Sequence, residues 1–196
     1  SVISKEFRDR YLSDPKNQNV FNGKAVVFEG PEDYHKRIND KKLKIDENSI
    51  LIIRGCGPVG YPGSAEVVNM QPPDRLLKKG ITHLPTLGDG RQSGTSESPS
   101  ILHVSPESAV GGDLGIVKTG DKMKIDLNKR RVDLLISQSE FKKRRKNKKL
   151  FKANNQTPWQ EIFRDTVGQL EDGACINSRG NYLDVSNKKG LPRNSH

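Results

Sequence analysis

Two short apolar runs in the first third of the chain predict buried β-strands. Residues 24–29 and 49–54 are rich in β-branched side chains, and a glycine follows each run directly. Runs of this kind are typical of strands whose two faces are both covered. Between them, residues 31–38 begin with a proline and two acids, a composition that favours the start of a helix. The pattern therefore predicts a strand, a helix and a second strand in succession.

The pattern further along the chain predicts a β-hairpin and several short helices. Residues 122–127 alternate polar and apolar side chains and are separated from residues 131–136 by a polar turn. This arrangement predicts two antiparallel strands. A short helix is predicted over residues 73–80, where glycine ends it, and another after residues 105–107, which supply its cap. We place Trp159 at the start of a last helix, with its indole anchoring that segment to the core.

These elements predict a sheet-rich α/β domain with a barrel-like sheet and peripheral helices. Residues 1–18 show no clear hydrophobic periodicity, and we interpret them as a linker or a cut edge. Residues 19–196 then form a single domain, long enough to bury one core. Because only 32% of the residues are hydrophobic and 30% are charged, we expect a small core and many loops.

Composition argues against a membrane or nucleic-acid partner. No apolar run approaches the ~18 residues of a membrane helix, and no charged and apolar leader opens the sequence, so we expect a cytoplasmic protein. The net charge of +10 is concentrated in residues 142–152, which carry eight positive charges and no acid. Such a run can bind phosphate backbones, but Phe151 is its only aromatic side chain for base stacking. We prefer a solvated basic helix face and keep a nucleic-acid-binding protein as the weaker alternative.

The most distinctive motif is the loop of residues 88–96, Gly-Asp-Gly-Arg-Gln-Ser-Gly-Thr-Ser. We expect Gly88, Gly90 and Gly94 to allow positive φ and a close approach of the backbone to a ligand, with successive N–H groups forming an anion-binding nest. Arg91 offers a fork of donors that suits a carboxylate or a phosphate. Further hydroxyl groups come from Ser93, Thr95 and Ser96. The alternative is a solvated Gly/Ser turn, which would be preferred if the loop stood alone.

A second glycine-rich loop lies upstream of the first. Residues 54–63 contain four glycines and lead to Glu66. We place Glu66 close to a loop-to-helix transition, where its carboxylate either complements the helix N-terminus or binds a hard cation such as Mg²⁺. Spacing alone favours the first of these roles.

The chain has two cysteines, Cys56 and Cys175. Zinc ions and iron–sulfur clusters normally need three or four ligands in paired spacing, so we expect no cluster to be held by this chain alone. We interpret Cys56 as a small residue that fills its loop and Cys175 as a buried structural thiol. A disulfide between them is not expected in a reducing compartment.

Several long motifs resemble one enzyme family, the dihydroxy-acid and phosphogluconate dehydratases, in its carboxyl-terminal part. The segments that carry the resemblance are residues 59–73, 87–96, 99–102, 105–112 and 156–161. Within that family, residues 28–35 and 190–196 are similar to the sugar-acid branch, nearest to the D-xylonate dehydratases. The resemblance runs over nearly the whole chain.

The resemblance implies a swivelling carboxyl-terminal domain of a much longer enzyme. In this family an amino-terminal domain, absent from this chain, carries the cysteines for an iron–sulfur cluster and most of the metal ligands. The implied partners are that domain, in the same polypeptide or in a partner chain, a small sugar-acid substrate, and further copies of the enzyme in a homo-oligomer. The isolated chain is then expected to be inactive.

The implied reaction is that of a hydro-lyase, the dehydration of an aldonic acid such as D-xylonate to a 2-keto-3-deoxy acid. By resemblance, Ser93 is the base, as an alkoxide, and Glu66 is the carboxylate that this domain contributes to a shared Mg²⁺ site. Arg91, Gly94 and Thr95 are the implied substrate-binding residues. A stand-alone, non-catalytic relative that keeps the loop for anion binding remains an alternative. The sequence does not choose among xylonate, arabinonate and gluconate.

Overall fold

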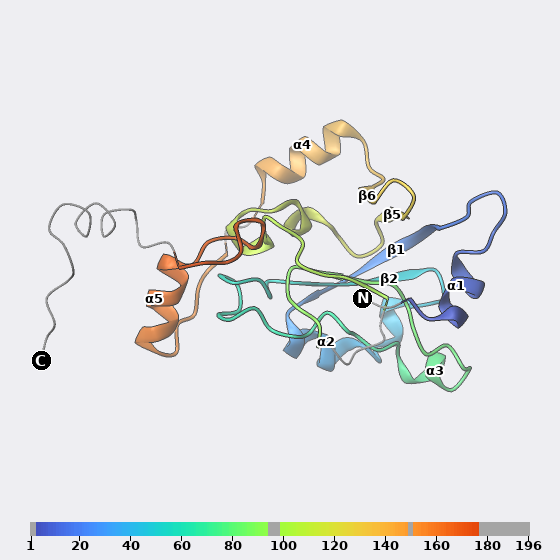
Figure 1. Cartoon of the computed structure of the whole chain (residues 1–196), viewed down its shortest axis with the longest axis horizontal. Helices are drawn as coiled ribbons and strands as arrows, with labels where there is room; N and C mark the ends of the chain where they lie inside the picture. Colours follow the sequence, from blue (N-terminus) through green and yellow to red (C-terminus); the bar gives the residue numbers. More distant parts are fainter. Residues whose placement is uncertain (1–2, 94–98, 149–150, 177–196) are drawn as a thin grey trace, which may run out of the picture.

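The computed structural model describes residues 3–93, 99–148 and 151–176. Its centre is a curled, half-barrel sheet of six strands in the order β4-β3-β2-β1-β5-β6, so the predicted α/β fold with a barrel-like sheet is confirmed (Figure 1). The strands are β1 (Val20–Glu29), β2 (Ser49–Arg54), β3 (Thr86–Gly88), β4 (Ser100–Ile101), β5 (Lys122–Asp126) and β6 (Arg131–Leu134).

Strand β1 joins two differently organised parts of the sheet. Its second half pairs in parallel with β2, starting at Lys24, and β3 and β4 continue the parallel part. Its first half pairs antiparallel with β5, ending at Lys24, and β6 completes the predicted hairpin. Because the two partners of β1 occupy different halves of its length, the sheet is staggered, and stagger curls a sheet towards a barrel.

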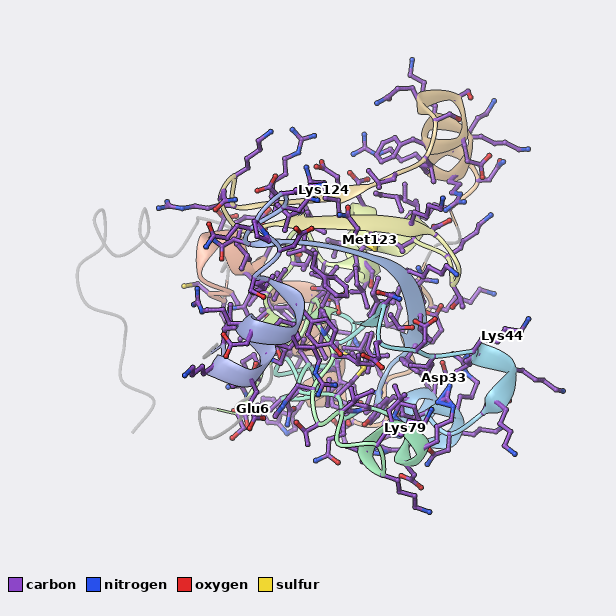
Figure 2. All side chains as sticks on the ribbon, turned by 90° about the vertical axis from the view of Figure 1, so that its right-hand side faces the viewer. Glu6, Asp33, Lys44, Lys79, Met123 and Lys124 are labelled. Carbon is purple, nitrogen blue, oxygen red and sulfur yellow. The ribbon has the colours of Figure 1, made fainter. Side chains whose placement is uncertain are left out.

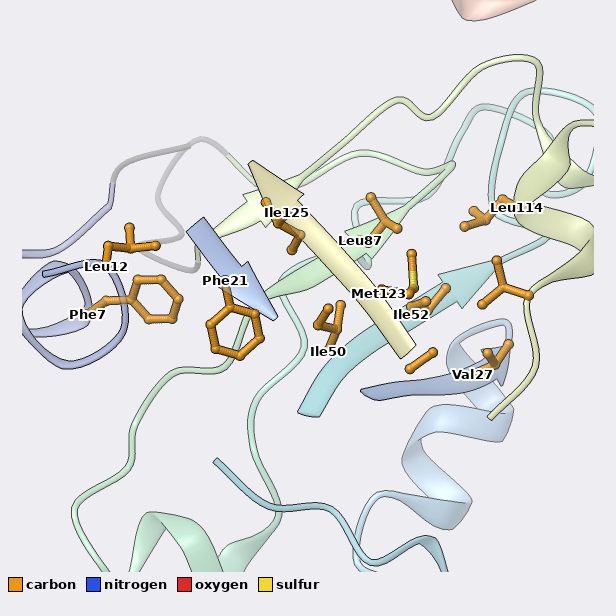
Figure 3. Packing of buried hydrophobic residues seen from close by; sticks show 12 residues of the cluster. Phe7, Leu12, Phe21, Val27, Ile50, Ile52, Leu87, Leu114, Met123 and Ile125 are labelled. Atoms are coloured by element: carbon orange, nitrogen blue, oxygen red, sulfur yellow. The ribbon is translucent and has the colours of Figure 1, made fainter. Parts of the chain in front are cut away.

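The parallel strands bury both of their faces, which explains their unbroken apolar sequences. Alternate residues such as Val27 and Ile52 point into one hydrophobic cluster, which also contains Phe7 and Met123 (Figure 3). The residues between them, such as Phe28, point into a second cluster on the opposite face. Since neither face meets water, no polar alternation is needed, and the strands predicted at residues 24–29 and 49–54 are confirmed.

Five α-helices lie around the sheet in the described part of the chain. They are α1 (Lys5–Tyr11), α2 (Pro31–Arg37), α3 (Asp74–Leu77), α4 (Gln138–Lys146) and α5 (Pro158–Thr166). Helices α2 and α3 lie on one side of the sheet and α4 on the other (Figure 1). The helix starts predicted at Pro31 and beside Trp159 are confirmed, with a proline in the first turn of each helix, where it presets φ and its missing N–H has no partner to lose. The helix predicted over residues 73–80 is shorter, because α3 begins after Pro73 and ends at Leu77. None of the described helices is long and apolar enough to cross a membrane.

The structure differs from the linker interpretation of residues 1–18. Residues 5–11 form α1, and its Phe7 and the following Leu12 are buried in the first hydrophobic cluster. Tyr11 packs between Phe7 and Phe21, with ring centroids 4.8 and 5.5 Å apart. The helix has only two turns, so it offers too few core contacts to produce a recognisable period in the sequence.

Two predictions near the end of the described chain were wrong. The indole of Trp159 is 77% exposed rather than anchored in the core, although α5 does begin beside it. Cys175 is exposed rather than buried, and neither cysteine forms a disulfide. Both errors share a cause, because residue type alone suggested burial while the location depends on what packs against the segment.

Candidate functional site

The two glycine-rich loops lie side by side at the carboxyl ends of β2 and β3. The backbone N–H of Arg91 donates to the carbonyl of Ala65 at 2.8 Å, and the N–H of Val68 donates to the carbonyl of Arg91 at 3.0 Å. These two bonds form an isolated parallel bridge between Glu66 and Arg91. Segments that the sequence marked separately are therefore joined in one structure.

The side chains of Glu66 and Arg91 meet across this bridge. The Nη1 of Arg91 lies 3.4 Å from Oε1 of Glu66, and its Nε donates to the carbonyl of Ser64 at 2.7 Å. The two side chains are 48% and 47% exposed, so solvent screening keeps the energy of the ion pair small. The contact therefore orients both groups while the Glu66 carboxylate stays accessible to a further partner.

The predicted helix after Glu66 is wrong. Residues 65–73 are extended or irregular apart from the bridge, and α3 starts only at Asp74. The reason is long-range, since the carbonyl of Ala65 and the N–H of Val68 bond to Arg91 and are not available for a helix. Pro72 and Pro73 also disfavour helical backbone in the residues before them. Glu66 therefore does not complement a helix N-terminus.

Gly88 and Gly90 serve close packing rather than positive φ, which corrects the sequence prediction. A Cβ at Gly88 would lie 2.8 Å from Ile53, and a Cβ at Gly90 would lie 2.8 Å from the carbonyl oxygen of Ala65. A Cβ atom essentially never lies this close to another atom, so a side chain at either position would force the neighbouring chain to shift. The glycines let the loops touch.

Asp89, between these glycines, is fully buried and ties three loops together. Its Oδ1 accepts from the N–H of Cys56 at 2.8 Å, and its Oδ2 accepts from the N–H of Gly55 at 3.1 Å. The same Oδ2 accepts from Ser108 through its N–H at 2.9 Å and its hydroxyl at 2.6 Å. A buried carboxylate is tolerated when its oxygens are this well supplied with donors.

Glu107 fixes the far end of the loop after β2 in the same way. Its carboxylate is fully buried and accepts from the N–H groups of Val59 and Gly60, both at 2.8 Å. The side-chain amide of Gln169 donates to it at 2.8 Å. The sequence predicted a helix cap here, but a short 3₁₀ helix (Ser108–Val110) follows and the carboxylate makes no capping bond.

Sequence reasoning assigned no role to Asp89 and misplaced Glu107. A usable signal did exist, because an acid flanked by glycines directly after a buried strand has little room to reach solvent. This pattern still does not predict which residues donate hydrogen bonds to Asp89, because they lie 19 to 34 residues away from it in the sequence.

Cys56 is fully buried beside Asp89, in agreement with its predicted role as a small filler. Burial raises the pKa of its thiol well above the ordinary value, and the nearby charge of Asp89 raises it further. A Cβ on Gly90 would lie 2.9 Å from the Cβ of Cys56, so the contact between the two loops at this point requires glycine at position 90. Because only the thiolate is a good nucleophile, Cys56 is not a catalytic candidate.

The remaining predicted site residues lie at the edge of what the structure describes. Ser93 is half-buried, two residues after Arg91. Gly94 and Thr95 lie outside the described residues. Among the residues that are described, no group of three or more histidine, cysteine, aspartate or glutamate side chains is arranged to hold a metal ion. Glu66 could supply one accessible carboxylate to Mg²⁺, which fits a site whose other ligands come from elsewhere.

Comparison with known proteins decides the family. A family model described as dihydroxy-acid/6-phosphogluconate dehydratase C-terminal matches residues 12–174. The chain belongs to this dehydratase family. The matched range of the dehydratase domain contains the Glu66–Arg91 contact, Ser93 and both buried carboxylates.

Individual dehydratases match the chain along much or all of its length. It is 56% identical over all 196 residues to the D-xylonate dehydratase of Caulobacter vibrioides, of which it covers 33%. It is 50% identical over 125 residues, 64% of the chain and 22% of the relative, to the L-arabinonate dehydratase of Rhizobium leguminosarum bv. trifolii. It is 40% identical over 157 residues, 80% of the chain and 28% of the relative, to the dihydroxy-acid dehydratase of Thermodesulfovibrio yellowstonii. The chain therefore spans a third or less of the length of these relatives.

Proposed function

We propose that this chain is the carboxyl-terminal domain of a sugar-acid dehydratase that acts on an aldonic acid such as D-xylonate. The observation that carries the proposal is the 56% identity to a D-xylonate dehydratase over all 196 residues. The geometry supports it, because the paired loops bring a carboxylate, a guanidinium and a serine to one edge of the sheet.

The reaction removes two groups from neighbouring carbons of the substrate. The proton on the carbon next to the carboxylate is abstracted, and the electron pair of that C–H bond forms a C=C bond as the hydroxyl on the next carbon departs with its own bonding electrons. The departing hydroxide takes up a proton and leaves as water, and the resulting enol tautomerises to the 2-keto-3-deoxy acid. We assign the abstraction to the Ser93 hydroxyl oxygen in its alkoxide form. A serine is a weak base until it is deprotonated, so the positive charge of Arg91 and the N–H groups of its loop must stabilise the alkoxide.

Arg91 and Glu66 have complementary parts in this proposal. Arg91 keeps Nη donors beyond its contacts with Ser64 and Glu66, and these suit the substrate carboxylate. Glu66 supplies one oxygen ligand to Mg²⁺, which when bound neutralises substrate charge and acts as a Lewis acid. The other metal ligands and the iron–sulfur cluster belong, in this proposal, to the amino-terminal domain of the complete enzyme.

The proposal is tested by comparing the complete polypeptide with the 196-residue chain. We expect the complete polypeptide, purified without oxygen, to convert D-xylonate to a keto acid detectable with a carbonyl reagent. We expect the 196-residue chain alone to form no keto acid and to show no cluster absorbance. Keto acid from the short chain would contradict the proposed division of the site. A complete polypeptide that binds sugar acids without dehydrating any would instead support the non-catalytic relative.

A second prediction concerns the metal role of Glu66. In the complete enzyme, Glu66→Gln keeps the shape of the side chain but removes its charge, so the Mg²⁺ concentration for half-maximal activity should rise by about tenfold or more. The half-exposed ion pair with Arg91 contributes little to folding, so the melting temperature should change little.

The matched control for this variant is Glu32→Gln, at an exposed position in α2. It removes the same charge away from the loops and should leave the Mg²⁺ titration unchanged. An unaltered titration in Glu66→Gln would show that this carboxylate only orients Arg91.

A further inference from the structure

A basic groove lies between α4 and the segment of residues 108–118. It has a volume of about 790 Å³ and is lined from both sides by cationic side chains. In Figure 1, α4 stands over the loops that carry this segment. The groove is separate from the Glu66–Arg91 contact, neither residue of which lines it.

Arg144 fixes α4 in place over the groove. Only 11% of its side chain is exposed, and it forms ion pairs with Asp121 and Glu140. It also donates to the carbonyl of Ile116 at 3.2 Å. One turn further on, the ammonium of Lys148 donates to the carbonyl of Gly112. The wall of the groove is therefore built by specific bonds, and the basic run is only partly the solvated face expected from the sequence.

The charges that line the groove are unbalanced. Six cationic side chains face two acids, Glu29 and Glu140, and each acid is ion-paired with an arginine. Arg54, the partner of Glu29, also donates hydrogen bonds to three backbone carbonyls. In the part of the chain that the structure describes, no ion pair involves the lysines of the groove. These are Lys118, Lys143, Lys148 and Lys152.

The ammonium of Lys148 is partly buried and lies among other charged groups. Burial lowers the pKa of its ammonium, and the nearby positive charges of Arg145 and Arg54 lower it further. The only opposing effect is that of Asp113, which is itself paired with Arg145. A bound anion would relieve the repulsion among these cations.

We propose that the groove binds a small, multiply charged anion of the phosphate type. Lysine ammonium groups bind phosphates as point charges, and several of them around one cavity favour a ligand with several negative charges over a singly charged sugar acid. The volume lies within the range of small-molecule sites, and Phe151 adds an apolar surface. The cationic residues line both walls of one groove, whereas an extended duplex would need them spread along an outer face. The inference does not depend on the proposed catalytic function.

The test is calorimetric titration of the complete polypeptide with inorganic pyrophosphate in buffer without Mg²⁺. We expect saturable binding at one site per chain, weakened about tenfold or more in Lys143→Gln/Lys148→Gln because two of the four lysine charges are removed. Lys118→Gln, on the opposite wall, should weaken binding in the same direction, which keeps the test decisive if loss of the Lys148 bond disturbs α4.

The matched control is Lys41→Gln/Lys79→Gln, which removes two exposed lysine charges elsewhere. Figure 2 shows Lys79 at the end of the molecule opposite α4. Binding by this control should equal that of the unaltered protein. Equal weakening in both double variants, absence of saturable binding, or displacement of bound pyrophosphate by D-xylonate at a lower concentration than pyrophosphate itself would overturn the proposal. Displacement of pyrophosphate by a short duplex DNA at lower concentration would also overturn it, in favour of a nucleic-acid surface.

Discussion

In the complete enzyme, Ser93→Ala should lower kcat by roughly a thousandfold or more while KM changes little. The reason is that a base acts on the substrate proton mainly in the transition state, so its loss affects turnover far more than ground-state binding. Steady-state kinetics on D-xylonate measure the two parameters separately. If Ser93 only held the substrate carboxylate, KM would rise instead, and Arg91→Lys would behave similarly through the loss of its bidentate fork.

Hydrogen exchange gives an independent measurement of the same step. The unaltered enzyme should exchange the substrate α-hydrogen with deuterated solvent, and Ser93→Ala should not. Arg91→Lys is the control, since it weakens binding but keeps the base and should retain exchange at saturating substrate. Exchange that persists in Ser93→Ala would assign the base to another residue, even if overall turnover had collapsed.

The second large effect is expected on stability, from Asp89→Ala. This substitution leaves the N–H groups of Cys56 and Ser108 without their buried acceptor, whereas the N–H of Gly55 keeps the hydroxyl oxygen of Ser108 as an acceptor at 2.8 Å. Each buried donor without a partner costs about 1–3 kcal/mol, so the loss of two acceptor bonds should lower the free energy of unfolding by about 2 kcal/mol or more. For a domain of this size that loss corresponds to a fall of about 4–8 °C in the melting temperature of the transition that unfolds this domain.

Calorimetry or circular dichroism on the complete polypeptide measures this change. Asp9→Ala, at an exposed position in α1, removes the same carboxylate without leaving a buried donor unpaired. It should change the free energy of unfolding by no more than about 0.5 kcal/mol. Asp89→Asn keeps one acceptor oxygen, so its melting temperature should lie between those of Asp89→Ala and Asp9→Ala. Equal melting temperatures for Asp89→Ala and Asp9→Ala would show that solvent replaces the carboxylate and that Asp89 does not hold the loops.

The sequence alone determined those elements whose cause is local. The strands at residues 24–29 and 49–54, the hairpin of β5 and β6, and the helix starts at or next to three prolines follow from side-chain pattern and backbone preference within a few residues. The sequence also marked the two glycine-rich loops, because their composition serves no core element. Their membership in a dehydratase domain followed from motifs that are themselves contiguous.

Only the tertiary structure decided how these loops are held. Glu66 lies beside Arg91 rather than at a helix start, and Gly88 and Gly90 are required by the closeness of the neighbouring chain. Asp89 bonds to residues far away in the sequence. The local sequence pattern also did not predict helix α1 or the exposure of Trp159. In each case the deciding free energy comes from burial or hydrogen bonding between distant segments, which exists only once the chain has folded and which no local pattern encodes.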